Sequence, residues 1–93
     1  MNVKVLSIEP TQEFKTFYVT VVIGEDICQF TMTVETDTIA NQNIQILNSD
    51  ENFLKTFQFN QKLAADISNL VFLVYNHQPI KLPVDMGELS SAA

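Results

Sequence analysis

The chain contains no arginine, and its 93 residues include one histidine, one cysteine and two glycines. Arginine is the usual bidentate partner of phosphate and carboxylate groups. Histidine is the usual acid, base or metal ligand near neutral pH, and glycine-rich loops let a backbone approach phosphates closely. A sequence poor in all three has few ways to build a standard catalytic or nucleotide-binding site, so no residue pattern in it names a function.

The lone cysteine and lone histidine form no recognisable reactive pair. A zinc site needs about four ligands, of which Cys28 and His77 supply two. Cys28 alternates with Phe30 and Met32, so we expect it to face the core, where thiols are usually inert. His77 follows a predicted helix and is best explained by a turn or by the helix dipole. We therefore expect a protein that is not an enzyme and that binds no metal ion and no cofactor.

Positive charge is scarce as well. Five lysines face eleven carboxylates, which gives a net charge of −6, and the lysines are spread along the chain. Affinity for nucleic acid comes largely from lysine and arginine, so we expect no nucleic-acid partner. An acidic surface would instead favour a basic protein surface.

Long apolar runs are missing. The longest covers residues 70–75, whereas a membrane-spanning helix needs about 20 residues, so we expect no membrane partner. Glu9 interrupts the N-terminal apolar residues too early for a signal peptide, and a single cysteine fits a reducing compartment. These features predict a cytoplasmic location.

Alternating apolar and polar residues predict antiparallel strands in the first half of the chain. The expected strands cover residues 3–8, 14–23, 27–35 and, more briefly, 44–47. Gly24 marks a hairpin turn, and the polar residues 36–43 are expected to form a loop. One face of the resulting sheet is apolar and needs a cover.

The other face of the predicted sheet is rich in threonine. Its members are Thr16, Thr20, Thr31 and Thr33. This face is a candidate binding surface, although threonine is also simply a good strand former with a solvated side chain.

Two helices are predicted in the second half. Ser49 or Asp50 is suited to cap a short helix that carries Phe53 and Phe57 on one side. A longer helix over residues 61–75 has an apolar stripe with helical spacing. The stripe consists of Leu63, Ile67, Leu70, Val71 and Val74.

The end of the longer helix, residues 70–75, is apolar on every side. It is either buried all round or part of a dimer interface, and its candidate interface residues are Leu70, Phe72, Leu73 and Tyr75. The same run also fits a strand paired with residues 80–84, because periodicity does not separate the two for six residues. Two prolines make residues 79–84 extended.

The sequence thus predicts a single α+β domain over residues 1–86, followed by a flexible tail over residues 87–93. A three- to four-stranded antiparallel sheet comes first, and one or two helices cover one of its faces. The expected core consists of Val19, Val21, Phe30, Met32, Val34, Leu63, Ile67, Leu70, Val71 and Val74.

Three functional hypotheses follow. The first is a small non-enzymatic accessory or regulatory protein that acts through a protein-binding surface, including a homodimer formed through residues 70–75 or through a sheet edge. The second is a small-molecule-binding domain or weak enzyme with a pocket between sheet and helix. Its polar candidates are Tyr18, Glu35, Asp66, Tyr75 and His77. The third is an acidic inhibitor of a basic partner, which requires the carboxylates to gather on one face.

Overall fold

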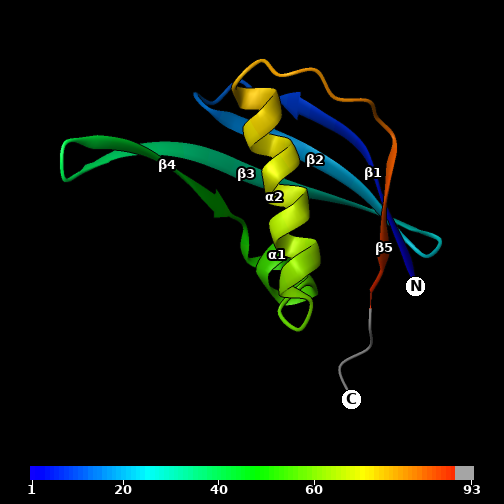
Figure 1. The fold of residues 1–93 in the computed structure, drawn as a ribbon. Coiled ribbons are helices and arrows are strands. Elements are labelled where there is room, and N and C mark those ends of the chain that lie inside the picture. Colours follow the sequence, from blue (N-terminus) through cyan, green and yellow to red (C-terminus); the bar gives the residue numbers. More distant parts are fainter. Residues whose placement is uncertain (90–93) are drawn as a thin grey trace.

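The computed structural model describes residues 1–89 as one curled antiparallel sheet with two helices on one of its faces (Figure 1). The elements are β1 (Asn2–Pro10), β2 (Thr16–Ile23), β3 (Asp26–Ile39), β4 (Gln42–Ser49), α1 (Glu51–Thr56), α2 (Gln61–Tyr75) and β5 (Val84–Glu88). The strand order is β4-β3-β2-β1-β5. The predicted α+β class with an antiparallel sheet is confirmed, but the predicted strand number was wrong, because the sheet has five strands.

Strands β2 and β3 form the predicted hairpin. Their register runs from Thr16 opposite Thr33 to Ile23 opposite Asp26. Gly24 lies in the turn with φ +64°, a conformation that other residues rarely adopt. The alternating apolar residues of both strands are buried beneath the helices, as their period of two requires.

The two helices begin where the sequence predicts. Asp50 caps α1, and its carboxylate accepts a hydrogen bond from the Phe53 N–H at 2.8 Å. The rings of Phe53 and Phe57 pack edge-on against Phe30 of β3, with centroids 5.4 Å and 5.9 Å away. These contacts join α1 to the sheet and continue the core beneath α2.

Helix α2 covers residues 61–75 as predicted, so the alternative of a strand over residues 70–75 was wrong. Leu63, Ile67 and Val71 are buried against the sheet. Leu70 and Val74 were predicted as core but are half-buried, because they lie on the flanks of the stripe rather than at its centre.

The predicted loop over residues 36–43 was wrong. Strands β3 and β4 continue through this segment as a regular hairpin, with Ile39 opposite Gln42. Ala40 and Asn41 form the two-residue turn, and both have positive φ (51° and 64°). Such turns usually contain Asn-Gly or Gly-Gly, so Ala-Asn offered little signal of a hairpin.

The fifth strand brings the two ends of the described chain together. Strand β5 pairs antiparallel with β1, from Asn2 opposite Glu88 to Val5 opposite Val84. Gly87 and Glu88 therefore belong to the sheet rather than to the expected tail. Residues 90–93 of that tail lie outside the described residues.

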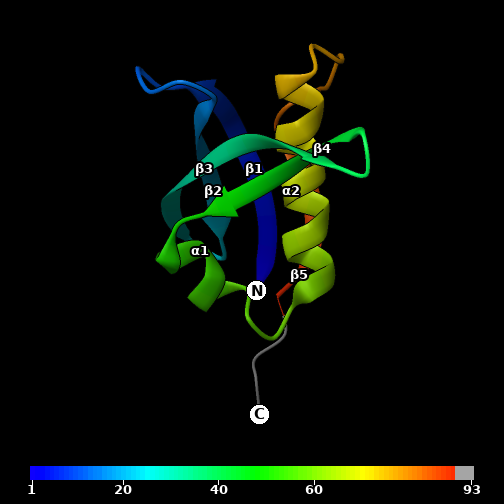
Figure 2. The ribbon, with the colours of Figure 1, turned by 90° about the vertical axis from the view of Figure 1, so that its left-hand side faces the viewer.

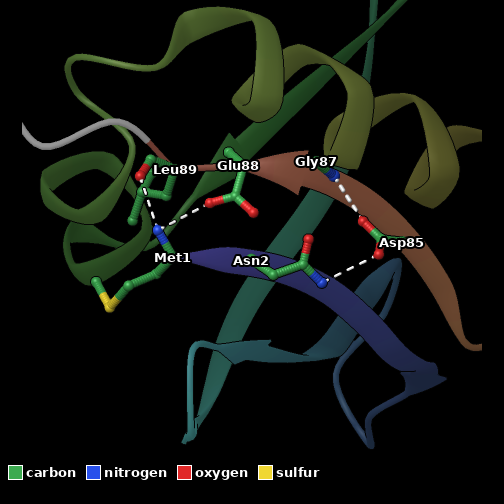
Figure 3. Close-up of polar contacts among 6 residues, drawn as sticks. All are labelled: Met1, Asn2, Asp85, Gly87, Glu88 and Leu89. Carbon is green, nitrogen blue, oxygen red and sulfur yellow. Dashed lines mark hydrogen bonds and ion pairs between the residues drawn. The ribbon is translucent and has the colours of Figure 1, made fainter.

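Polar contacts reinforce this pairing (Figure 3). The Asn2 amide donates to Asp85 Oδ2 at 3.0 Å, and the Gly87 N–H donates to Asp85 Oδ1 at 2.9 Å. The Met1 amino group lies 3.1 Å from Glu88 Oε2. These groups hold the beginning of β1 against the end of β5.

Neither helix in the described part of the chain combines the length and the apolar character that crossing a membrane requires.

Candidate interaction surface

The outer part of the β3–β4 hairpin projects from the body of the molecule (left in Figure 1, foreground in Figure 2). Residues 35–46 are all exposed, which makes this the longest exposed run within the described strands. We call this segment the β3–β4 arm. A two-stranded ribbon without a covering layer is only marginally stable in water, so an arm of this length is suited to pack against something else.

The apolar residues of the arm lie on the opposite face from those of the sheet body. In the body, Val34 and its cross-strand partner Leu47 face the helices. Beyond them, the positions facing the helix side are polar: Thr36, Thr38, Asn43 and Gln45. The isoleucines of the arm occupy the alternate positions, and so they point to the outer face of the sheet.

Three isoleucines are therefore presented to solvent on the outer face of the arm. Ile39 is 53% exposed, Ile44 38% and Ile46 39%. Both helices of the described chain pack against the other face of the sheet, α1 through Phe53 and Phe57 and α2 through its buried stripe, so neither covers these side chains. The residues opposite Ile44 and Ile46 are Asp37 and Glu35, which place an acidic column beside the apolar one.

Strand β4 is also a sheet edge without the usual protection. Natural edge strands are kept from pairing by charges, prolines, bulges or short length. Strand β4 is eight residues long, carries no charged residue and no proline, and pairs with β3 without a register shift. The other edge, β5, has five residues, contains Asp85 and Glu88, and shows a register shift against β1.

The arm is anchored to the body near its middle. The Gln45 and Asn76 side-chain amides exchange two hydrogen bonds, both of 2.9 Å. Asn76 is the C-cap of α2, so these two bonds join the arm to the C-terminal end of the helix. Among the described strands, β4 has β3 as its neighbour on one side and none on the other.

The predicted threonine face exists but is less open than expected. Thr16 is buried, and Thr20, Thr31 and Thr33 are half-buried. The Thr16 and Thr33 hydroxyls lie 3.0 Å apart and hydrogen-bond each other. Part of this face borders an open hollow of about 730 Å³, which residues 10–13 line together with Thr16, Tyr18 and Thr31. The hydroxyls of Thr16 and Thr33 therefore satisfy part of each other's hydrogen-bonding capacity.

The predicted interface residues of α2 differ in their exposure to solvent. Leu73 is 39% exposed, whereas Leu70, Phe72 and Tyr75 are half-buried against the core. Leu73 lies one turn before Asn76 and thus on the side of α2 that approaches β4. Within this run, Leu73 is the residue that extends the exposed apolar surface toward the arm.

An apolar cleft of about 400 Å³ lies where the β1–β2 connection meets the end of α2. Tyr75 and His77 line it together with Phe14, which is 84% exposed. The Lys15 ammonium lies 5.3 Å from the centroid of the Phe14 ring and 5.9 Å from that of Tyr75. Of the five polar candidates for a pocket, this cleft unites Tyr75 and His77.

The other polar candidates lie elsewhere. Tyr18 borders the hollow on the outer face, and Glu35 is on the arm. Asp66 pairs with Lys62 at 2.8 Å on the surface of α2. Cys28 lies toward the β2–β3 turn and His77 beside the opposite end of β2, so the structure does not bring them together.

The carboxylates are divided between the two ends of the sheet. Glu25 and Asp26 lie at the β2–β3 turn, whereas Glu35 and Asp37 lie on the arm at the other end of the sheet (Figure 1). Among residues 1–89, no cluster of three or more histidine, cysteine or carboxylate side chains is arranged to hold a metal ion.

The isoleucines of the arm were missed by the sequence prediction. The alternation Ile44-Gln45-Ile46 predicts a short strand of the covered sheet, not an exposed arm.

Comparison with protein families, with curated protein sequences and with solved structures finds no match to this chain.

Proposed function

We propose that this chain is a small non-enzymatic protein that binds another protein chain through the β3–β4 arm. The observation that carries the proposal is the reversal of the apolar face along the hairpin. Isoleucines on a surface that neither helix within residues 1–89 covers are stabilised when a partner removes them from water. The uncharged edge of β4 adds a row of backbone donors and acceptors to the same surface.

The supporting surface combines the isoleucine column of β4 on the outer face with the backbone edge of that strand. Leu73 of α2 adds an exposed apolar side chain on the opposite, helix-covered face. Apolar residues at the centre with polar groups around them are typical of protein interfaces. The acidic column of Glu35 and Asp37 flanks the isoleucines and disfavours partners that bring carboxylates to that position.

Small-molecule binding in the cleft beside Lys15 is the second candidate function. Its support is the apolar lining with a single ammonium group at its edge. It ranks second because Tyr18, Glu35 and Asp66 lie outside this cleft, which leaves little polar chemistry to recognise a ligand.

The proposal is tested by capture from the native host with a matched pair of variants. The double variant Ile44→Thr, Ile46→Thr removes the apolar column but keeps β-branched side chains that suit a strand. We expect it to change the free energy of unfolding by less than about 1 kcal/mol and to lower partner recovery at least about tenfold. Recovery is measured by quantitative mass spectrometry of the tagged chain at native expression level.

The control is Asn43→Thr, which introduces the same side chain on the opposite face of the same strand without removing an isoleucine. We expect it to retain the partner, whether that partner is a different protein or a second, differently tagged copy. The proposal fails if recovery is equal for both variants, or if no stoichiometric protein accompanies the wild-type chain.

A further inference from the structure

We infer that the protein that pairs with the arm is a second copy of this chain, joined edge to edge through antiparallel β4 strands. This inference rests on the proposed function and names its partner. It follows from the absence of edge protection on β4, because an unprotected edge strand can pair with the same strand of another copy of the chain.

Charge favours this edge as the meeting point of two copies. Each copy carries a net charge of −6, so most approaches between copies bring carboxylates together. Strand β4, Gln42–Ser49, contains no charged residue. The carboxylates of Glu35 and Asp37 lie one strand further in, on β3.

The separation of these carboxylates in the pair is large enough for salt to screen them. Neighbouring strands lie about 4.8 Å apart, so β3 and the β3 strand of the second copy would be about 14 Å apart. The Debye length at physiological ionic strength is about 8 Å. Repulsion between the two acidic columns is therefore weak, and the contact itself is between uncharged residues.

The sequence of β4 also defines the register. A two-fold axis perpendicular to the sheet keeps the outer faces of both copies on the same side. Residues that stand opposite each other must therefore both be odd-numbered or both be even-numbered. With the axis at Gln45, Ile44 stands opposite the second copy's Ile46, and this pair occurs twice. Each isoleucine then gains an apolar cross-strand neighbour, which is the contact that stabilises sheets.

The other sheet edge does not offer this arrangement. Strand β5 contains Asp85 and Glu88, and its register against β1 is shifted between Val3 and Lys4. Pairing between two β5 edges would bring carboxylates close together on adjacent strands. The two β4 edges therefore pair at the centre of the dimer, which leaves no β4 edge for a further copy.

The first experiment measures mass by light scattering across a concentration series for the purified full chain. We expect a species of twice the 10.5 kDa chain mass and no larger assemblies, because the symmetric contact uses each β4 edge once. A wild-type chain that remains a single copy at every concentration tested overturns the inference.

The second experiment tests the register by charge exchange. In the variant Ile44→Lys, Ile46→Lys, lysines oppose lysines across the two-fold axis, and in Ile44→Glu, Ile46→Glu, glutamates oppose glutamates. We expect each variant alone to dissociate at least about tenfold more readily than wild type. Circular dichroism establishes that each variant alone is folded.

Mixing the two variants places each lysine opposite a glutamate, so we expect a mixed pair to form and to be recovered through a tag on either copy. The inference is overturned if two folded variants form no mixed pair. Asn43→Lys with Asn48→Lys is the control for added charge, since about Gln45 these positions stand opposite the second copy's Leu47 and Gln42 and not opposite each other.

A disulfide gives an independent check of the axis. In a Cys28→Ser background, Gln45→Cys places two thiols directly opposite each other, within the distance that a disulfide requires. We expect mild oxidation to give a covalent pair, and we expect Gln29→Cys, exposed on β3 outside the segment that pairs with β4, to give none. Equal cross-linking of both variants contradicts the β4 contact.

The outcomes separate this inference from the proposed function. A single-copy chain that captures a different protein through Ile44 and Ile46 overturns the second-copy inference and leaves the proposed function standing. A chain with no arm-dependent partner of either kind overturns both.

Discussion

At the scale of single residues, Asp50 connects two segments that are distant in the sequence. One carboxylate oxygen caps α1 through the Phe53 N–H, and the other accepts a hydrogen bond from the Thr31 N–H of β3, both at 2.8 Å. The Asp50 N–H in turn donates to the Thr31 carbonyl at 3.0 Å. Sequence reasoning found the cap, whereas the contact with β3 depends on how the chain folds back.

Replacement of Asp50 measures both contacts. Asp50→Ala is expected to lower the free energy of unfolding by about 2–3 kcal/mol, because a helix cap and a second hydrogen bond to a charged acceptor are both lost. Asp50→Asn keeps a good cap but replaces one carboxylate oxygen with an amide that cannot accept from Thr31. We expect it to lose about half as much in urea denaturation. Equal losses for both variants would show that the Thr31 contact contributes nothing.

At the scale of elements, α2 and the arm differ in where their apolar residues lie. Helix α2 buries its stripe against the sheet, with Ile67 and Val71 fully inaccessible to solvent. The arm instead meets the C-cap of α2 through the Gln45–Asn76 hydrogen bonds at its middle, and its isoleucines lie on the opposite face of the sheet. The apolar residues of α2 therefore stabilise the fold, whereas the isoleucines of the arm remain exposed on the surface.

The position of α2 is tested by Ile67→Asp. An unpaired carboxylate at a fully buried position is strongly unfavourable, and we expect a loss above about 4 kcal/mol, enough to unfold much of a small domain at 37 °C. The control is Asn69→Asp, which adds the same charge on the exposed side of the helix. Its thermal melting, followed by circular dichroism, is expected to stay within a few degrees of wild type. A folded Ile67→Asp variant would contradict the packing of α2.

At the scale of the whole molecule, the first and last strands stabilise each other. Strand β5 covers the outer edge of β1, and Asp85 accepts hydrogen bonds from both strands (Figure 3). The backbone hydrogen bond from Gly87, followed by the Asn2 amide and the charge of Lys4, lowers the pKa of Asp85 from its ordinary value of 3.8. A lowered pKa means that the folded state favours the ionised carboxylate.

The sign of the resulting pH effect follows from linkage. The contribution of Asp85 to stability is complete above its ordinary pKa and is lost as the pH falls below that value through the lower pKa of the folded state. We expect Asp85→Asn to remove this part of the acid destabilisation, so that its stability changes less than that of wild type across this range. Urea denaturation at a series of acidic pH values measures the difference. Parallel curves would show that the ionised form has no advantage in the folded chain.

The β2–β3 hairpin and α2 were predictable because their signals are local. The alternation around Phe30 has a period of two, the stripe around Ile67 has helical spacing, and both patterns match the structure. Leu70 and Val74 were assigned to the core because spacing identifies a face of the helix but not how far the sheet extends beneath it. Ala40 and Asn41 concealed a hairpin because their composition is unusual for its turn.

The sequence by itself therefore determined the α+β class, the hairpin, both helix starts and the scarcity of catalytic groups. Only the tertiary structure decided that β5 pairs with β1 and that β4 forms an edge, since strand order depends on contacts between distant segments. It also decided which way the arm isoleucines point. Alternation alone assigns Ile44 and Ile46 to one face, but the register of β4 against β3, and the length of helix beneath the sheet, determine whether that face is covered.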